Sequence, residues 1–112
     1  MCRNLIKLTY LDLSENKLTR VSHEIKLMTN LQKLKLNNNV LSTLPMEITM
    51  LTNLKELNLE SNVLINIPSE IGGMEGLLEL YLERNKLKTI PSSIGQLTNL
   101  RKLNLNDNLL GK

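Results

Sequence analysis

Leucine residues recur along the chain at a fixed spacing of 23 residues. The pattern begins with Leu8, Leu11 and Leu13, and it continues with Asn16 and Leu18. The same five positions hold the same residues in each of the four later copies, without insertion or deletion. A repeat of this length is typical of a solenoid, in which each copy folds as one structural unit against its neighbours.

The first half of each unit is predicted to form a strand followed by a turn. Leu11 and Leu13 are separated by one polar residue, so both leucines point to the same side of a strand. The asparagine breaks this alternation where the chain must turn, and a buried amide has donors and an acceptor to satisfy. Stacked asparagines are therefore expected to bond the backbone of neighbouring units. This structural ladder consists of Asn16, Asn39, Asn62, Asn85 and Asn108.

The second half of each unit is predicted to form a short helical turn. Its first apolar residue is followed by proline in three units, whereas Ser22 takes this place in another. Proline fixes φ and suits the first position of a helical turn. The spacing Pro-x-x-Ile-x-x-Leu, as in Pro45, Ile48 and Leu51, points apolar residues back toward the strand leucines. One unit cannot bury its own apolar face, so the units are expected to stack.

The complete unit, L-x-x-L-x-L-x-x-N-x-L-x-x-L/I-P-x-x-I-x-x-L-x-x, resembles the leucine-rich repeat. The 23-residue form with proline is similar to that of intracellular Ras-suppressor and plant intracellular Ras-group-related proteins. This resemblance implies an α/β solenoid, with a curved parallel β-sheet on the concave face and short helical or 3-10 turns on the convex face.

The whole chain, 1–112, is expected to form a single domain of repeats. A partial unit is assigned to residues 1–7, where Cys2 and Leu5 take the Ile and Leu/Met positions of the later units. Complete units are assigned to 8–30, 31–53, 54–76 and 77–99, and a second partial unit to 100–112. Capping units are not recognisable, so we expect a piece of a longer array or a short array whose ends a partner covers. End-to-end self-association through uncapped ends is a further alternative.

The resemblance also implies that the outward-facing strand residues are the usual binding surface. Parallel strands lie about 4.8 Å apart, so equivalent positions form rows across the sheet. The first row is Tyr10, Lys33, Glu56, Glu79 and Lys102. The second row is Asp12, Lys35, Asn58, Tyr81 and Asn104. The third row is Ser14, Asn37, Glu60, Glu83 and Asn106, flanked by Glu15, Asn38, Ser61, Arg84 and Asp107. The predicted partner contacts are Tyr81, Glu83, Glu60, Glu56, Glu79, Arg84, Asn58, Lys33, Lys35 and Tyr10.

Two features select this contact set. Tyr10 and Tyr81 are the only aromatic residues, and tyrosine is enriched at binding hot spots. Tyrosine also favours β surfaces in general, which is the structural alternative. The carboxylates around Tyr81 would favour a basic partner surface. The alternative is an ordinary solvated surface, partly neutralised by Lys33 and Lys102.

Composition and charge exclude several classes of protein. The 27 Leu and 15 Asn, with no Ala, Phe or Trp, indicate one packing problem solved repeatedly. The net charge of +3 does not come from the basic stripe that a nucleic-acid binder carries. No apolar run reaches the roughly 18 residues of a membrane helix. The single cysteine excludes a disulfide framework.

Catalytic and metal-binding constellations are not found in the sequence. His23 is the only histidine, and the repeat register brings no Cys or Ser nucleophile near it. One Cys and one His cannot form a zinc site. The carboxylates lack the dense loop of oxygen ligands that calcium requires. The glycine-rich segment 72–76 lacks the Lys-Ser/Thr pair of a phosphate-binding loop. We therefore expect no enzymatic activity, no metal and no cofactor.

The sequence thus favours a non-enzymatic module that binds a protein through the concave sheet. The resemblance to Ras-suppressor-like repeats implies a small GTPase or another signalling protein as partner. The charge distribution and the lack of a long apolar run lead us to expect no nucleic acid and no membrane as partners. The alternatives are a regulatory segment of a larger kinase, phosphatase or cyclase, and an extracellular recognition domain. The lack of Asn-x-Ser/Thr sites and of Cys-rich caps favours a cytoplasmic location.

Overall fold

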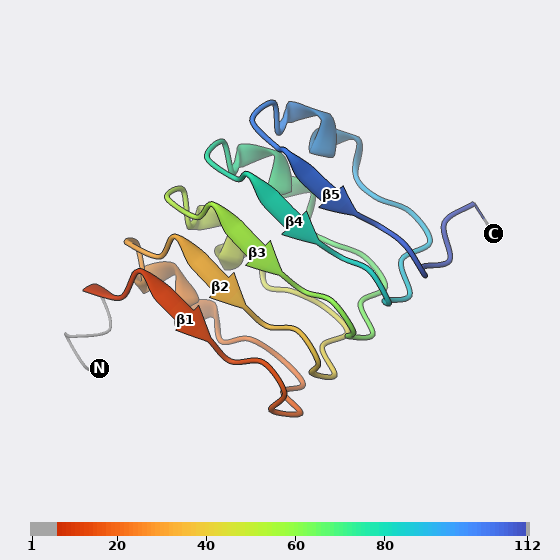
Figure 1. The fold of residues 1–112 in the computed structure, drawn as a ribbon, viewed down its shortest axis with the longest axis horizontal. Coiled ribbons are helices and arrows are strands. Elements are labelled where there is room, and N and C mark those ends of the chain that lie inside the picture. Colours follow the sequence, from red (N-terminus) through yellow and green to blue (C-terminus); the bar gives the residue numbers. More distant parts are fainter. Residues whose placement is uncertain (1–6, 112) are drawn as a thin grey trace.

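Five short strands form one parallel sheet in the computed structural model, which describes residues 7–111. The strands are Tyr10–Asp12 (β1), Lys33–Lys35 (β2), Glu56–Asn58 (β3), Glu79–Tyr81 (β4) and Lys102–Asn104 (β5). They lie side by side in chain order, and each pairs with the next at an offset of one 23-residue repeat (Figure 1). The predicted solenoid with its parallel sheet is therefore confirmed.

Short 3-10 helices form the opposite, convex side of the array (Figure 1). They are His23–Leu27 (η2), Met46–Met50 (η3), Ser69–Gly73 (η4) and Ser92–Gln96 (η5). Each helix returns the chain behind its strand, so that one repeat makes one turn of the solenoid. Across residues 7–111, no helix is both long enough and apolar enough to span a membrane.

Helices η3, η4 and η5 begin one residue after the proline of the repeat, whereas the sequence pattern predicts that the proline is the first helical residue. Pro45, Pro68 and Pro91 are extended N-cap residues, with φ between −70° and −61°, and not the first helical residues. The Pro45 carbonyl accepts the first helical bond, from Ile48 N at 3.1 Å. Proline is suited to this place because its fixed φ matches the required conformation and its missing N–H is not used there. Ser22 replaces it in η2 and caps by side chain, its Oγ accepting from Glu24 N at 3.2 Å.

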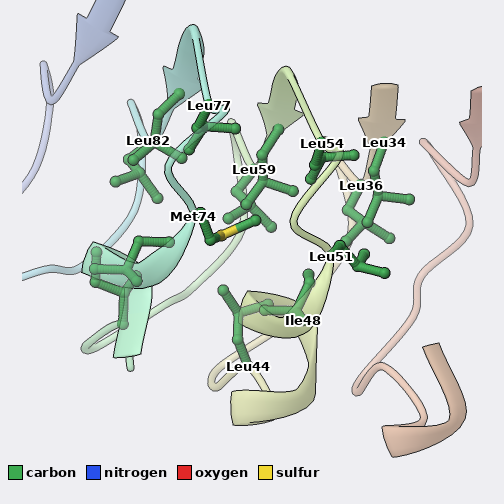
Figure 2. Close-up of a cluster of buried hydrophobic side chains, with 14 of the residues drawn as sticks. Leu34, Leu36, Leu44, Ile48, Leu51, Leu54, Leu59, Met74, Leu77 and Leu82 are labelled. Carbon is green, nitrogen blue, oxygen red and sulfur yellow. The ribbon is translucent and has the colours of Figure 1, made fainter. Parts of the chain in front are cut away.

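The leucines of the strands and the apolar residues of the helices meet in one continuous core (Figure 2). Leu34, Leu36, Leu57 and Leu59 have no solvent-exposed surface. The outermost described units are less covered, and Leu103 of β5 is 40% exposed. A core built from stacked identical layers buries a side chain fully only where a unit lies on both sides. Cys2 and Leu5, which the sequence places in the same core, lie outside the described residues.

A ladder of asparagine side chains joins consecutive units at the end of the strands. Asn62 is 6% exposed, and its Oδ1 accepts from Leu41 N of the preceding unit at 3.0 Å. Its Nδ2 donates to Leu36 O of that unit and to Leu59 O of its own unit, at 3.0 and 3.1 Å. Asn39, Asn85 and Asn108 make equivalent bonds across the unit boundary. The Asn16 side chain donates to Leu13 O and Ser14 O of its own unit, and the Asn16 backbone N–H donates to Asn39 Oδ1 of the next unit at 3.0 Å.

Gly72 allows the helices η4 and η5 to pack closely. A Cβ atom at Gly72 would lie 2.7 Å from the Ser93 carbonyl oxygen and 2.6 Å from Gln96 Oε1. Gly95 occupies the equivalent position in the next unit, and a Cβ there would meet nothing within 4 Å. The two glycines therefore form a matched pair that differs only in the space around the backbone.

We expect Gly72→Ala to lower the free energy of unfolding by about 1–3 kcal/mol, since overpacking forces the neighbouring helix to shift. Gly95→Ala should stay within about 0.5 kcal/mol of the wild type. Urea unfolding followed by circular dichroism measures both values. Similar costs at the two positions would show that the contact between η4 and η5 does not restrict residue 72.

Candidate concave binding face

The outward-facing residues of the five strands line the concave face in regular rows. The strand register places Glu56 beside Glu79, and it places Asn58 beside Tyr81. The side chains at positions 79, 81 and 83 alternate with buried leucines, so they point to the same side. The same register brings Lys33 next to Tyr10 and Glu56 in the first row. These rows contain both tyrosines of the sequence and all three of the carboxylates that lie within the described strands.

The basic groups on the N-terminal half of the face are bound by neighbouring side chains. Lys33 Nζ lies 3.5 Å from Glu56 Oε2 and 5.4 Å from the centroid of the Tyr10 ring. Lys35 Nζ lies 3.9 Å from Asp12 Oδ2. Each lysine thus crosses one strand boundary and reaches an acidic residue of the adjacent unit. This half of the face is consequently close to internal charge balance.

The Asp12 carboxylate is held in a turn at the end of β1. Its Oδ1 accepts two hydrogen bonds from Ser14, one from the hydroxyl at 2.5 Å and one from the backbone N–H at 2.9 Å. These bonds lower the pKa of Asp12, because they stabilise the charged form, and Lys35 and Lys33 act in the same direction. Asp12 is therefore a fixed negative charge at neutral pH.

Tyr81 lies at the centre of an acidic cluster on the C-terminal half. Its hydroxyl donates to Glu79 Oε1 at 2.6 Å. This hydrogen bond, partial burial and the charges of Glu79, Glu56 and Glu83 raise the pKa of Tyr81 to about 12. Each of these causes favours the neutral phenol over the phenolate. The side chain is thereby held neutral and oriented throughout the physiological pH range.

The sequence predicts four carboxylates around Tyr81, but three of them act on it. Glu56, Glu79 and Glu83 influence its ionisation. Glu60 instead pairs with Arg84, whose Nη1 lies 3.7 Å from Glu60 Oε2. Both residues belong to the predicted contact set. Because Glu60 is paired with Arg84, the negative charge that acts on Tyr81 comes from the other three carboxylates.

Two residues outside the predicted contact set shape the same site. Asn104 of β5 donates from Nδ2 to Glu83 Oε2 at 3.0 Å. Asp107 lies 4.0 Å from Arg84 Nε, so it shares this guanidinium with Glu60. The other Glu83 oxygen, Oε1, is buried and has no hydrogen-bond partner among the described residues. Asn104 and Asp107 both lie in the rows predicted from the sequence. Their adjacency to Glu83 and Arg84 is the signal that could have identified them.

We expect the phenol of Tyr81 to titrate near pH 12 in a Tyr10→Phe variant, where it is the only tyrosine. Absorbance of the phenolate at alkaline pH measures this value directly. Glu79→Ala should move the midpoint down toward 10, because it removes both the acceptor of the hydrogen bond and the negative charge of Glu79. Between pH 10 and 12 the unfolded chain releases the proton while the folded chain keeps it, so stability should fall as pH rises through this window. A midpoint that Glu79→Ala leaves unchanged would contradict a role of this hydrogen bond in the shift.

Other parts of the described surface have fewer groups that could bind a ligand or react. An apolar pocket of about 370 Å³ lies at the N-terminal end, between Leu13 of the sheet side and Ile25 of η2. It lies at the edge of the core formed by the first of the described units. Within residues 7–111, no three His, Cys, Asp or Glu side chains are grouped so that they could hold a metal ion. His23 is an exposed residue at the start of η2.

Comparisons with known proteins agree with this architecture. No curated protein matches the chain in sequence. Among solved structures, a leucine-rich repeat protein of Leptospira interrogans is 40% identical, with a TM-score of 0.74, over 94% of this chain and 33% of its own. The plant peptide hormone receptor RGFR1, solved in complex with RGF2, is 44% identical, with a TM-score of 0.78, over 89% of this chain and 18% of its own. The functional domain of InlJ from Listeria monocytogenes is 31% identical, with a TM-score of 0.83, over 95% of this chain and 22% of its own.

The chain thus spans about a third or less of the length of these three structures. The leucine-rich repeat region, as a sequence family, matches residues 1–109. Domains of this family typically serve as protein-interaction modules. The repeat register, the parallel sheet and the family match agree, and the chain belongs to the leucine-rich repeat family.

Proposed function

We propose that the chain is a non-enzymatic module that binds a partner protein through the concave face of its sheet. The observation that carries this proposal is the placement of Tyr81 on β4 of that face, oriented by Glu79 and surrounded by further charged side chains. A half-buried, rigid aromatic ring with polar neighbours is typical of interface hot spots. The leucines beneath it hold the backbone in place, so the surface is formed before a partner arrives.

The comparisons support a role in recognition. The plant receptor that resembles the chain is solved in complex with RGF2. The similarity of the 23-residue unit to Ras-suppressor-like repeats supports a signalling protein, such as a small GTPase, as the partner. A cytoplasmic setting belongs to the same proposal and rests on the sequence features alone.

Paired capture experiments test this proposal. The wild-type chain and a Tyr81→Ala/Glu83→Lys variant serve as baits, after circular dichroism has shown that both fold. Glu70→Lys on η4 is the matched control, because it makes the same charge change at an exposed position of the convex side. A partner should be retained by the wild type and by Glu70→Lys, and its purified form should bind the concave variant at least tenfold more weakly. Loss of binding with Glu70→Lys alone would place the interface on the convex side.

A further inference from the structure

The concave face contains one complete tyrosine–lysine–glutamate arrangement. Lys33 Nζ lies above the Tyr10 ring, 5.4 Å from its centroid, and also 3.5 Å from Glu56 Oε2. The cation is therefore shared between an aromatic face and a carboxylate of the next strand. Such sharing is favourable because the ring and the carboxylate both present negative potential to the cation.

Tyr81 has the corresponding carboxylates, but among residues 7–111 no cation lies over its ring. Glu79 is bonded to its hydroxyl, and Glu83 lies on the same side of the chain two residues further on. Lys102 is opposite Glu79 in the strand register, yet no ion pair within 4.0 Å connects them in the part of the chain that the structure describes. Arg84 is paired with Glu60 and Asp107 instead.

The hydrogen bonding of Glu83 is a second indication that the side chains around Tyr81 lack a donor. Its Oε2 accepts from the neutral amide of Asn104, whereas Oε1 is buried without a hydrogen-bond donor from residues 7–111. A carboxylate oxygen without a donor is costly in a partly dehydrated place. A cation bound at Tyr81 would therefore be attracted by the carboxylates of Glu79 and Glu83, whose charges both act on the Tyr81 hydroxyl.

We propose that Tyr81, Glu79 and Glu83 form a subsite for an arginine side chain on an extended basic segment of the partner protein. This inference rests on the proposed function, since it names the chemistry that the concave face recognises. The planar guanidinium of arginine stacks on an aromatic ring and donates several hydrogen bonds at its edge, which a lysine ammonium cannot do in the same way. The Lys33 arrangement on the same sheet shows that this fold accommodates a cation between a tyrosine and a carboxylate.

Two synthetic peptides of opposite charge test this subsite in the Tyr10→Phe chain, where Tyr81 is the only tyrosine. The probes are acetyl-Gly-Arg-Gly-Arg-Gly-amide and its Glu counterpart, titrated at low salt while the Tyr81 ring signals are followed by NMR. The Arg peptide should shift these signals in a saturable way, and the Glu peptide should not. Equal shifts from both peptides, or no saturable shift from the Arg peptide, would overturn the inference.

Charge-neutral variants separate the subsite from the overall charge of the chain. Glu79→Gln/Glu83→Gln should weaken binding of the Arg peptide by about tenfold or more, as expected for lost charge-assisted bonds. The control Glu47→Gln/Glu70→Gln removes the same charge from the convex helices and should leave the affinity unchanged. Equal weakening by both pairs would reduce the effect to net charge and overturn the subsite.

The outcome is distinguishable from failure of the proposed function. If a captured partner depends on the concave face while Glu79→Gln/Glu83→Gln leaves its affinity unchanged, the arginine subsite is wrong and the concave interface stands. If Glu70→Lys alone abolishes capture, the concave interface is wrong. The arginine subsite is then also wrong as the recognition site of that partner.

Discussion

Replacing Asn62 by alanine should lower the free energy of unfolding by about 3–5 kcal/mol, which is among the largest effects expected for one substitution. The Asn62 amide joins two units, accepting from Leu41 N and donating to Leu36 O and Leu59 O. Removal of the side chain leaves Leu41 N buried without a partner. Leu36 O and Leu59 O each lose one bond but still accept from Asn39 Nδ2 and Asn85 Nδ2. The orphaned N–H costs about 1–3 kcal/mol in a dry environment, and each of the two lost bonds to a carbonyl oxygen costs about 0.5–1.5 kcal/mol.

Asn16 is the matched control for this prediction. It occupies the same position of the repeat, but it is exposed, and among the described residues its side chain bonds only to Leu13 O and Ser14 O of its own unit. Asn16→Ala should therefore cost less than about 1 kcal/mol, because water can reach the groups that lose their partner. Urea unfolding of the two variants measures the difference. Equal costs would show that the bonds across the unit boundary add nothing to stability.

Leu59→Ala should destabilise the chain by about 2–5 kcal/mol, because it removes a fully buried side chain between two covering units. The surrounding layers of the repeat, shown in Figure 2, leave little freedom to close the cavity. Leu105 occupies the same position of the last described strand unit and is only partly buried. Leu105→Ala should therefore cost clearly less than Leu59→Ala.

Denaturant unfolding at several protein concentrations checks this pair of variants. A smaller cost at Leu105 that is independent of concentration is expected for a monomer whose last unit is partly uncovered. A cost at Leu105 equal to that at Leu59 would contradict this, since it would mean that another copy or partner covers the end of the core.

The strand and core positions could be predicted from the sequence because the repeat removes most of the ambiguity. Leu11 and its equivalents recur without insertion, so one choice of strand register sets the pairing of all five strands. The alternation around Leu57 and Leu59 decides which side of each strand faces the core. The same periodicity assigns Glu56, Asn58 and Tyr81 to the outward rows.

Contacts between individual polar side chains could not be predicted in this way. The repeat register places Glu60 and Glu83 next to each other, but it does not reveal that Arg84 turns toward Glu60. It also does not show that Asn104 bonds to Glu83. These choices depend on side-chain torsions and on neighbours from two units at once. The sequence predicts Pro45 at the first helical position, whereas the structure has it at the N-cap. The sequence does not separate the two positions, because the fixed φ of proline suits both.

The most direct test of the central claim is site-specific photocrosslinking to the captured partner. A benzophenone side chain is introduced at position 58, in the middle row of the concave face, or at position 70 on the convex helix η4. Binding through the concave sheet predicts that the partner is crosslinked efficiently from position 58 and not from position 70. Crosslinking from position 70 without crosslinking from position 58 would contradict the account.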